Sequence, residues 1–95
     1  MILSEVIQIA EGKLLTPNAN LQLEIKGGFA GDLMSDVLAS IMPESLLITG
    51  LSNPQVVRTA IIADVRAIIF ARGKSLSPET IQLAIEEKIP VISSK

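Results

Sequence analysis

Residues 26–40, KGGFAGDLMSDVLAS, carry the clearest structural pattern of this 95-residue chain. Glycine permits positive φ and close backbone approach, and three glycines fall between Gly27 and Gly31. The alternating run Leu21–Ile25 comes just before them. We therefore expect a strand over residues 21–25, which Gly27 and Gly28 end sharply.

A helix is expected to begin at Asp32 and to continue to Ser40. Asp32 is suited to cap this helix, because its carboxylate can accept hydrogen bonds from the amides of the first turn. The apolar side chains fall on one face, which we expect to be buried: Leu33, Met34, Val37, Leu38 and Ile41. The other face is small and acidic: Asp32, Ser35, Asp36, Ala39 and Ser40. It is either a solvated surface or a surface that packs on a second subunit or faces a ligand.

The composition indicates a single small domain over residues 1–95. Hydrophobic residues make up 48% of the chain and aromatic residues only 2%, so the core is built from Ile, Leu, Val and Ala. A chain this short and aliphatic cannot easily cover all of its apolar surface. We therefore expect a homodimer.

Several functional classes are excluded by residue content. The net charge is −2, so we expect no binding to nucleic acid. Cysteine and histidine are both absent, which removes disulfides, thiolate and histidine catalysis and the commonest metal ligands. We expect no enzyme activity, metal or cofactor. No run reaches the length of a membrane-spanning helix and no signal-peptide pattern opens the chain. We therefore expect a cytoplasmic protein that does not associate with a membrane.

The remaining elements alternate between strands and helices. We expect a short helix in residues 1–10 and a short strand in residues 13–15. Asn53-Pro54 and Ser77-Pro78 are typical helix starts, with a capping side chain followed by proline at the first position. Apolar strands are expected at residues 46–49, 66–70 and 90–93. This order predicts an α/β fold with parallel strands, right-handed crossovers and a sheet covered on both faces.

A ligand site is expected beyond the carboxyl ends of these strands, where open parallel sheets bind ligands. The residues there offer hydroxyl groups, glycine amides and two cations that suit a small anion: Thr49, Gly50, Ser52, Asn53, Arg72, Gly73 and Lys74. No phosphate-binding fingerprint is present. The alternative is that Asn53 and Ser77 only cap helices and that Arg72 and Lys74 are solvated.

The segment Gly27–Ala39 and the later order of elements resemble small stand-alone DRTGG-domain proteins over nearly the whole chain. The resemblance implies a three-layer α/β/α domain with a mainly parallel sheet, similar to the N-terminal domain of HPr kinase/phosphorylase. In this family an Asp-Arg pair follows the third strand and Thr-Gly-Gly the fourth. Here residues 51–53 are Leu-Ser-Asn, and residues 71–73 are Ala-Arg-Gly, which keep only the last glycine. Relatives usually continue into a further helix beyond the position of Lys95.

Such domains act as regulatory or dimer-forming modules, so the resemblance implies a non-catalytic regulatory or interaction module, with a homodimer or another protein as its partner. The family segment and the exposed helix faces supply the interface candidates Gly27, Gly28, Asp32, Ser35, Asp36 and Ile62. Ile62 is an apolar residue on a face that is otherwise polar, with Gln55, Arg58 and Thr59. The alternative function is a small-ligand sensor that binds a nucleotide or phosphorylated metabolite at the strand ends, with Arg72 gripping a phosphate.

Overall fold

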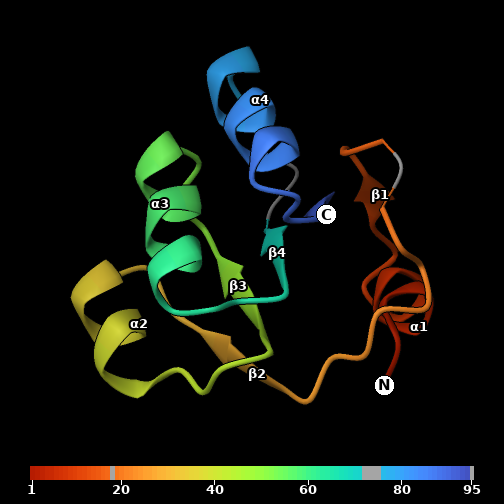
Figure 1. Cartoon of the computed structure of the whole chain (residues 1–95), viewed down its shortest axis with the longest axis horizontal. Helices are drawn as coiled ribbons and strands as arrows, with labels where there is room; N and C mark the ends of the chain where they lie inside the picture. The colour runs from red at the N-terminus through yellow and green to blue at the C-terminus, as the bar shows by residue number, and fades with distance from the viewer. Residues whose placement is uncertain (18, 72–75, 95) are drawn as a thin grey trace.

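The computed structural model describes residues 1–17, 19–71 and 76–94. Four helices and five strands occur in this part of the chain: α1 (Leu3–Ile9), β1 (Lys13–Leu14), β2 (Gly27–Ala30), α2 (Met34–Ser40), β3 (Ser45–Thr49), α3 (Pro54–Ile62), β4 (Ala67–Phe70), α4 (Pro78–Glu86) and β5 (Val91–Ser93). Figure 1 shows α2, α3 and α4 on one side of the strands and α1 on the other. The predicted three-layer α/β/α architecture is confirmed.

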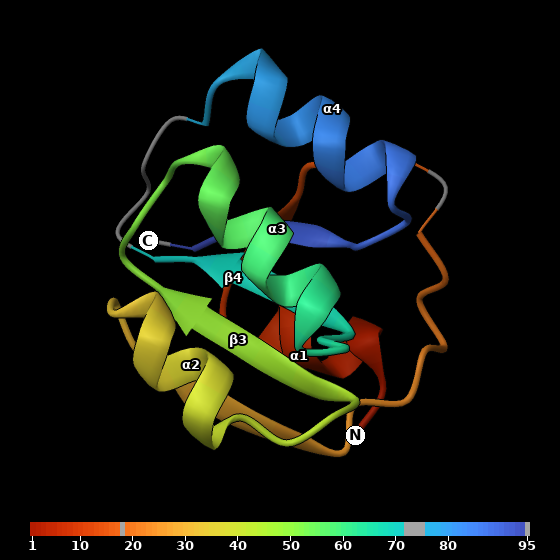
Figure 2. The same cartoon turned by 60° about the vertical axis from the view of Figure 1, so that its left-hand side comes forward.

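The strands form one five-stranded sheet in the order β1-β5-β4-β3-β2. Strands β2 to β5 are parallel to one another, and β1 pairs antiparallel with β5 at the edge. Each new parallel strand is added on the same side of the last, so right-handed crossovers bring α2, α3 and α4 to one face. Figure 2 shows these three helices in front of the sheet and α1 behind it.

Strand β4 separates two hydrophobic cores. Ile68 and Phe70 belong to the cluster beneath α2, α3 and α4. Ala67 and Ile69 belong to the cluster beneath α1. All four residues are buried, which explains why this strand is a continuous apolar run instead of an alternating one.

The prediction of a strand over residues 21–25 is wrong. This segment instead forms backbone hydrogen bonds with the N-terminal residues: Leu3 N donates to Leu23 O over 2.9 Å, and Ile25 N donates to Met1 O over 2.7 Å. The glycines predicted to end a strand are themselves in β2, where Gly27 lies opposite Ser45 and Gly28 opposite Leu46. Glycine is a poor strand former, so the pairing with β3 overrides local propensity here.

The predicted capping role of Asp32 is also wrong. Helix α2 begins at Met34, with Leu33 as its N-cap residue and no capping side chain. Of the apolar face predicted to be buried, Val37 is fully buried, but Leu33 is 60% exposed and Leu38 is 48% exposed. A helix of seven residues does not cover its whole apolar face with the core of so small a domain.

The other two helix starts are confirmed. Asn53 Oδ1 accepts a hydrogen bond from Gln55 N over 3.0 Å, and Ser77 Oγ accepts one from Thr80 N over 3.2 Å. Helices α3 and α4 end in Schellman motifs, in which Val65 N donates to Ala60 O and Ile89 N donates to Ala84 O. Each motif places a non-glycine residue in the left-handed region, Asp64 with φ 55° and Lys88 with φ 58°.

Candidate functional site

A hollow of about 340 Å³ lies at the carboxyl ends of β2, β3 and β4. Its lining is backbone-rich and small: Ala30, Gly31, Asp32, Ile48, Thr49, Gly50 and Ala71. The parallel pairing of β2 with β3 and of β3 with β4 brings these chain segments together. The hollow therefore lies where the sequence predicted a ligand site.

The Asp32 carboxylate accepts hydrogen bonds from the main donors of this site. Gly50 N donates to Asp32 Oδ1 over 2.6 Å, and Thr49 Oγ1 donates to the same oxygen over 3.2 Å. Thr49 Oγ1 also accepts from Leu51 N over 3.2 Å. Because a carboxylate already accepts from these donors, an incoming anion at this point would meet like charge. This part of the hollow favours a ligand group that donates hydrogen bonds.

The structure brings together only some of the predicted ligand-binding residues. Thr49 and Gly50 are buried and line the hollow, whereas Ser52 is half-buried and outside the lining. Asn53 is exposed, and its side-chain oxygen caps α3. The predictions on Arg72, Gly73 and Lys74 lie outside the described residues. Asp32 was predicted as a helix cap and an interface residue, and its contact with Gly50 was not foreseen, because residues 18 positions apart become neighbours only through strand pairing.

The predicted interface residues lie on β2, α2 and α3, except Asp32, which is exposed between β2 and α2. Gly27 and Gly28 are exposed on β2, at the edge of the sheet, and Ser35 and Asp36 are exposed on the neighbouring α2. Ile62 is 73% exposed at the end of α3. Thr59, expected on the same polar face as Ile62, is 2% exposed and therefore belongs to the interior. Whether these residues form an interface stays a prediction.

The opposite end of the sheet holds an ion triad. Glu44 pairs with Lys26 over 2.8 Å and with Arg66 over 2.7 Å, so it joins the starts of β2, β3 and β4. Hydrogen bonds from Lys26 and then Arg66 lower the pKa of the Glu44 carboxyl below its ordinary value of 4.5. The triad is far along the strands from Asp32, and we assign it a structural role.

The mixed sheet, with helices on both faces and a hollow at the strand ends, defines a three-layer α/β domain. The family model of the DRTGG domain matches residues 5–95, so the chain belongs to the DRTGG domain family.

A solved structure with the same fold comprises the CBS and DRTGG domains of the regulatory region of Clostridium perfringens pyrophosphatase, complexed with the activator diadenosine tetraphosphate. The TM-score is 0.78 and the sequence identity is 19%. The similarity covers 98% of this chain and 40% of that chain, so this chain spans less than half the length of that region. No curated protein matches this sequence.

No helix within residues 1–17, 19–71 and 76–94 is long and apolar enough to cross a membrane. In the same part of the chain, no group of three or more acidic side chains is arranged to hold a metal ion.

Proposed function

We propose that this chain is a non-catalytic regulatory module that forms a homodimer. Membership of the DRTGG family and the regulatory setting of the similar pyrophosphatase domain support the regulatory role. The observation that carries the dimer is the exposure of large apolar side chains on two adjacent helices. Leu38 on α2 is 48% exposed, Met42 just after α2 is 71% exposed and Ile62 on α3 is 73% exposed. We call these residues the α2–α3 surface.

Packing of the two helices brings Met42 and Ile62 to one end of the molecule. Helices α2 and α3 contact each other, and both run from the carboxyl ends of the strands towards the amino ends (Figure 2). Glu44 N donates to Asp64 O over 2.9 Å, which joins the segments that follow the two helices. Met42 and Ile62 therefore both lie near this junction. Burying one such side chain contributes about 1.5–3 kcal/mol, so a second copy of the surface is a favourable partner.

Sedimentation equilibrium of the wild type and Ile62→Glu tests the dimer. We expect the wild type to be dimeric at micromolar concentration and Ile62→Glu to be monomeric, because the substitution places a charge in the contact. Ile9→Glu is the matched control, since Ile9 is 69% exposed but lies on α1, on the other face of the sheet. A monomeric wild type would refute the dimer. If only Ile9→Glu caused dissociation, the dimer contact would have to be assigned to α1 instead.

A second candidate function is a sensor for a nucleotide or a phosphorylated metabolite at the strand ends. The hollow there and the nucleotide activator bound by the similar pyrophosphatase region favour it. Asp32 accepts hydrogen bonds, so its natural contact is a ribose hydroxyl or an exocyclic amine rather than phosphate. The phosphate is left to Arg72 and Lys74, as the sequence predicts.

A thermal-shift series with adenosine, AMP, ATP and diadenosine tetraphosphate tests the sensor. Selective binding to the folded state raises the melting temperature. We expect Arg72→Ala to weaken the binding of AMP at least about tenfold and leave adenosine binding nearly unchanged, because Arg72 contributes a charge-assisted hydrogen bond only to phosphate. Asp32→Asn is expected to weaken the binding of both AMP and adenosine. The absence of any shift across the series would exclude this nucleotide site.

A further inference from the structure

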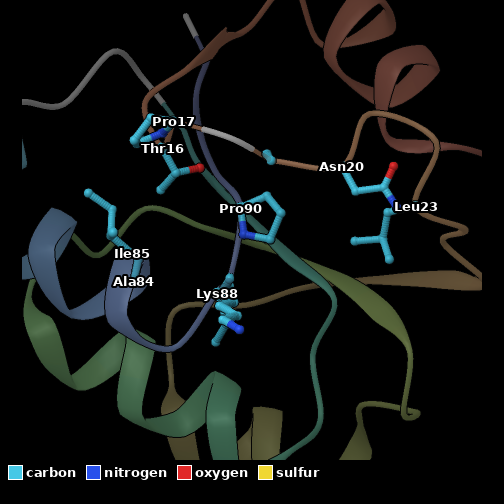
Figure 3. Close-up of a pocket in the computed structure, with 10 residues that line it drawn as sticks. Thr16, Pro17, Asn20, Leu23, Ala84, Ile85, Lys88 and Pro90 are labelled. Atoms are coloured by element: carbon cyan, nitrogen blue, oxygen red, sulfur yellow. The ribbon is translucent and has the colours of Figure 1, made fainter.

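A larger hollow, of about 450 Å³, lies at the opposite end of the sheet from the strand carboxyl ends. It is formed between residues 16–17 and 19–23 on one side and the C-terminal end of α4 on the other, with Pro90 just before β5 (Figure 3). Its volume falls within the range of about 300–1,000 Å³ that is usual for small-molecule sites. Neither the sequence pattern nor the family match assigns a ligand to this position.

The walls of this hollow are mainly apolar. Ile85 and Ala84 of α4 lie on one side, Leu23 lies across from them, and Pro90 lies between (Figure 3). Ala84 and Pro90 are buried, while Ile85 is 36% exposed and borders the opening. A ligand that fills this space must therefore present hydrocarbon to these side chains.

Among the described residues, two side chains at the hollow keep hydrogen-bond donors for a ligand. The buried Thr16 hydroxyl oxygen already accepts from Val91 N over 3.2 Å. Asn20 Oδ1 accepts from Gln22 N over 3.0 Å, so the side-chain NH₂ of Asn20 is the group that remains for a ligand. Lys88 makes no ion pair within the described residues, whereas Lys26, Arg58 and Arg66 each pair with a glutamate. The ligand must therefore present an acceptor to Asn20 and Lys88.

The neighbouring charges limit this acceptor to a single negative charge. An adjoining hollow shares Leu23, Lys88 and Ile89 and is also lined by Arg66, Asp64 and Glu87. Arg66 is paired with Glu44, so its charge is already offset. The C-terminal end of α4 adds a partial negative charge at the same place. A phosphate would be repelled by these groups more strongly than a carboxylate, because it carries more charge.

We propose that the hollow between residues 19–23 and α4 binds a small aliphatic monocarboxylate. The hydrocarbon chain packs against Leu23, Ile85 and Pro90, and the carboxylate accepts hydrogen bonds from Lys88 and Asn20. This site is independent of the dimer surface and of the hollow at the strand carboxyl ends.

Titration of the ¹⁵N-labelled chain with hexanoate and with neutral hexanamide tests the proposal by backbone amide chemical shifts. We expect hexanoate to give saturable shifts confined to residues 19–23 and 84–91, with about tenfold weaker binding of hexanamide, because only the carboxylate forms a charge-assisted hydrogen bond with Lys88. Lys88→Gln should bring the two affinities together. Lys13→Gln is the matched control and should keep the difference, since Lys13 is exposed on β1 and also has no ion pair within the described residues.

A second variant tests the apolar wall without disturbing the interior. Ile85→Glu changes a side chain at the opening and should abolish binding of both compounds, while the spectrum outside residues 80–91 stays as in the wild type. Equal affinities for hexanoate and hexanamide in the wild type would overturn the proposal. So would shifts that do not saturate, or shifts centred on Leu38, Met42 and Ile62, which would indicate unspecific binding to exposed apolar surface.

Discussion

Replacing Gly12 with alanine tests how closely the segment after α1 approaches β5. A Cβ atom on Gly12 would overlap Ile92 Cγ2 and would lie 3.2 Å from the carbonyl oxygen of Ser93. Ile92 is fully buried, and its branched Cβ leaves it few alternative rotamers. The clash must therefore be relieved by a shift of the backbone, and overpacking of this kind costs about 1–3 kcal/mol.

Urea unfolding and thermal melts of Gly12→Ala measure this cost. For a domain of this size, each 1 kcal/mol lowers the melting temperature by about 4–8 °C. Gly28→Ala is the matched control, because the nearest atom to its added Cβ is Leu46 O at an ordinary 3.9 Å. We expect Gly28→Ala to be neutral or to stabilise the fold by up to about 1 kcal/mol, since alanine lowers the entropy of the unfolded chain.

A double variant identifies the atom responsible. Ile92→Leu removes the methyl group on Cβ that Gly12→Ala meets, so the double variant should lose less stability than the sum of the two single variants. If Gly12→Ala is within about 0.5 kcal/mol of Gly28→Ala, the close approach of Gly12 to β5 is refuted as the reason for glycine at this position.

Three further substitutions probe other contacts. Glu44→Gln should make the free energy of unfolding less dependent on pH under acid conditions. Lys26 and Arg66 hold the pKa of Glu44 below 4.5, so the stabilising contribution of Glu44 is present above that pH and is lost as the pH falls through the lowered pKa. An unchanged pH profile of urea unfolding would contradict this. Lys88→Gly should stabilise the fold by about 0.5–1 kcal/mol in thermal melts, because Lys88 has φ 58° at the end of α4 and glycine adopts this conformation freely. A lower melting temperature would show that the Lys88 side chain contributes more to stability than the backbone strain costs. Asp32→Ala should cost about 1–2 kcal/mol by urea unfolding, because the buried Gly50 amide loses its acceptor, and exposed Asp36→Ala serves as the control that should leave stability unchanged.

Local sequence patterns were sufficient to predict most of the fold. Asn53-Pro54 and Ser77-Pro78 located the starts of α3 and α4, because capping and proline act within a few residues of the helix end. The apolar runs located β3, β4 and β5 to within a residue or two, because a strand buried on both faces needs no alternation. The parallel arrangement followed from the alternation of these elements with helices.

The failures in placing the strands and in assigning Asp32 involve contacts between distant parts of the chain. The alternating residues 21–25 have the pattern of a strand, yet they pair with residues 1–4, while the glycine-rich Gly27–Ala30 pairs with β3 instead. The larger hollow joins residues 16–17 and 19–23 to residues 84–90, and nothing in these segments alone indicates the contact. A hollow does lie at the strand carboxyl ends, where a general rule on parallel sheets led us to expect a ligand site. The hydrogen bonds that Asp32 accepts there depend on a register that no local pattern fixes.

Asp32 also connects the strand-end hollow to the proposed dimer surface. It is bonded to Gly50 after β3, and the chain then enters α2 at Met34, only two residues later. A ligand group that draws Asp32 away from Gly50 therefore pulls on the start of α2, whose far end presents Leu38 and Met42. Because α2 is a single helix of seven residues, we expect a shift at its start to move the whole helix. If both proposed functions hold, linkage requires that such a ligand and dimerisation alter each other's affinity by the same factor, which ties ligand sensing to self-association in one element.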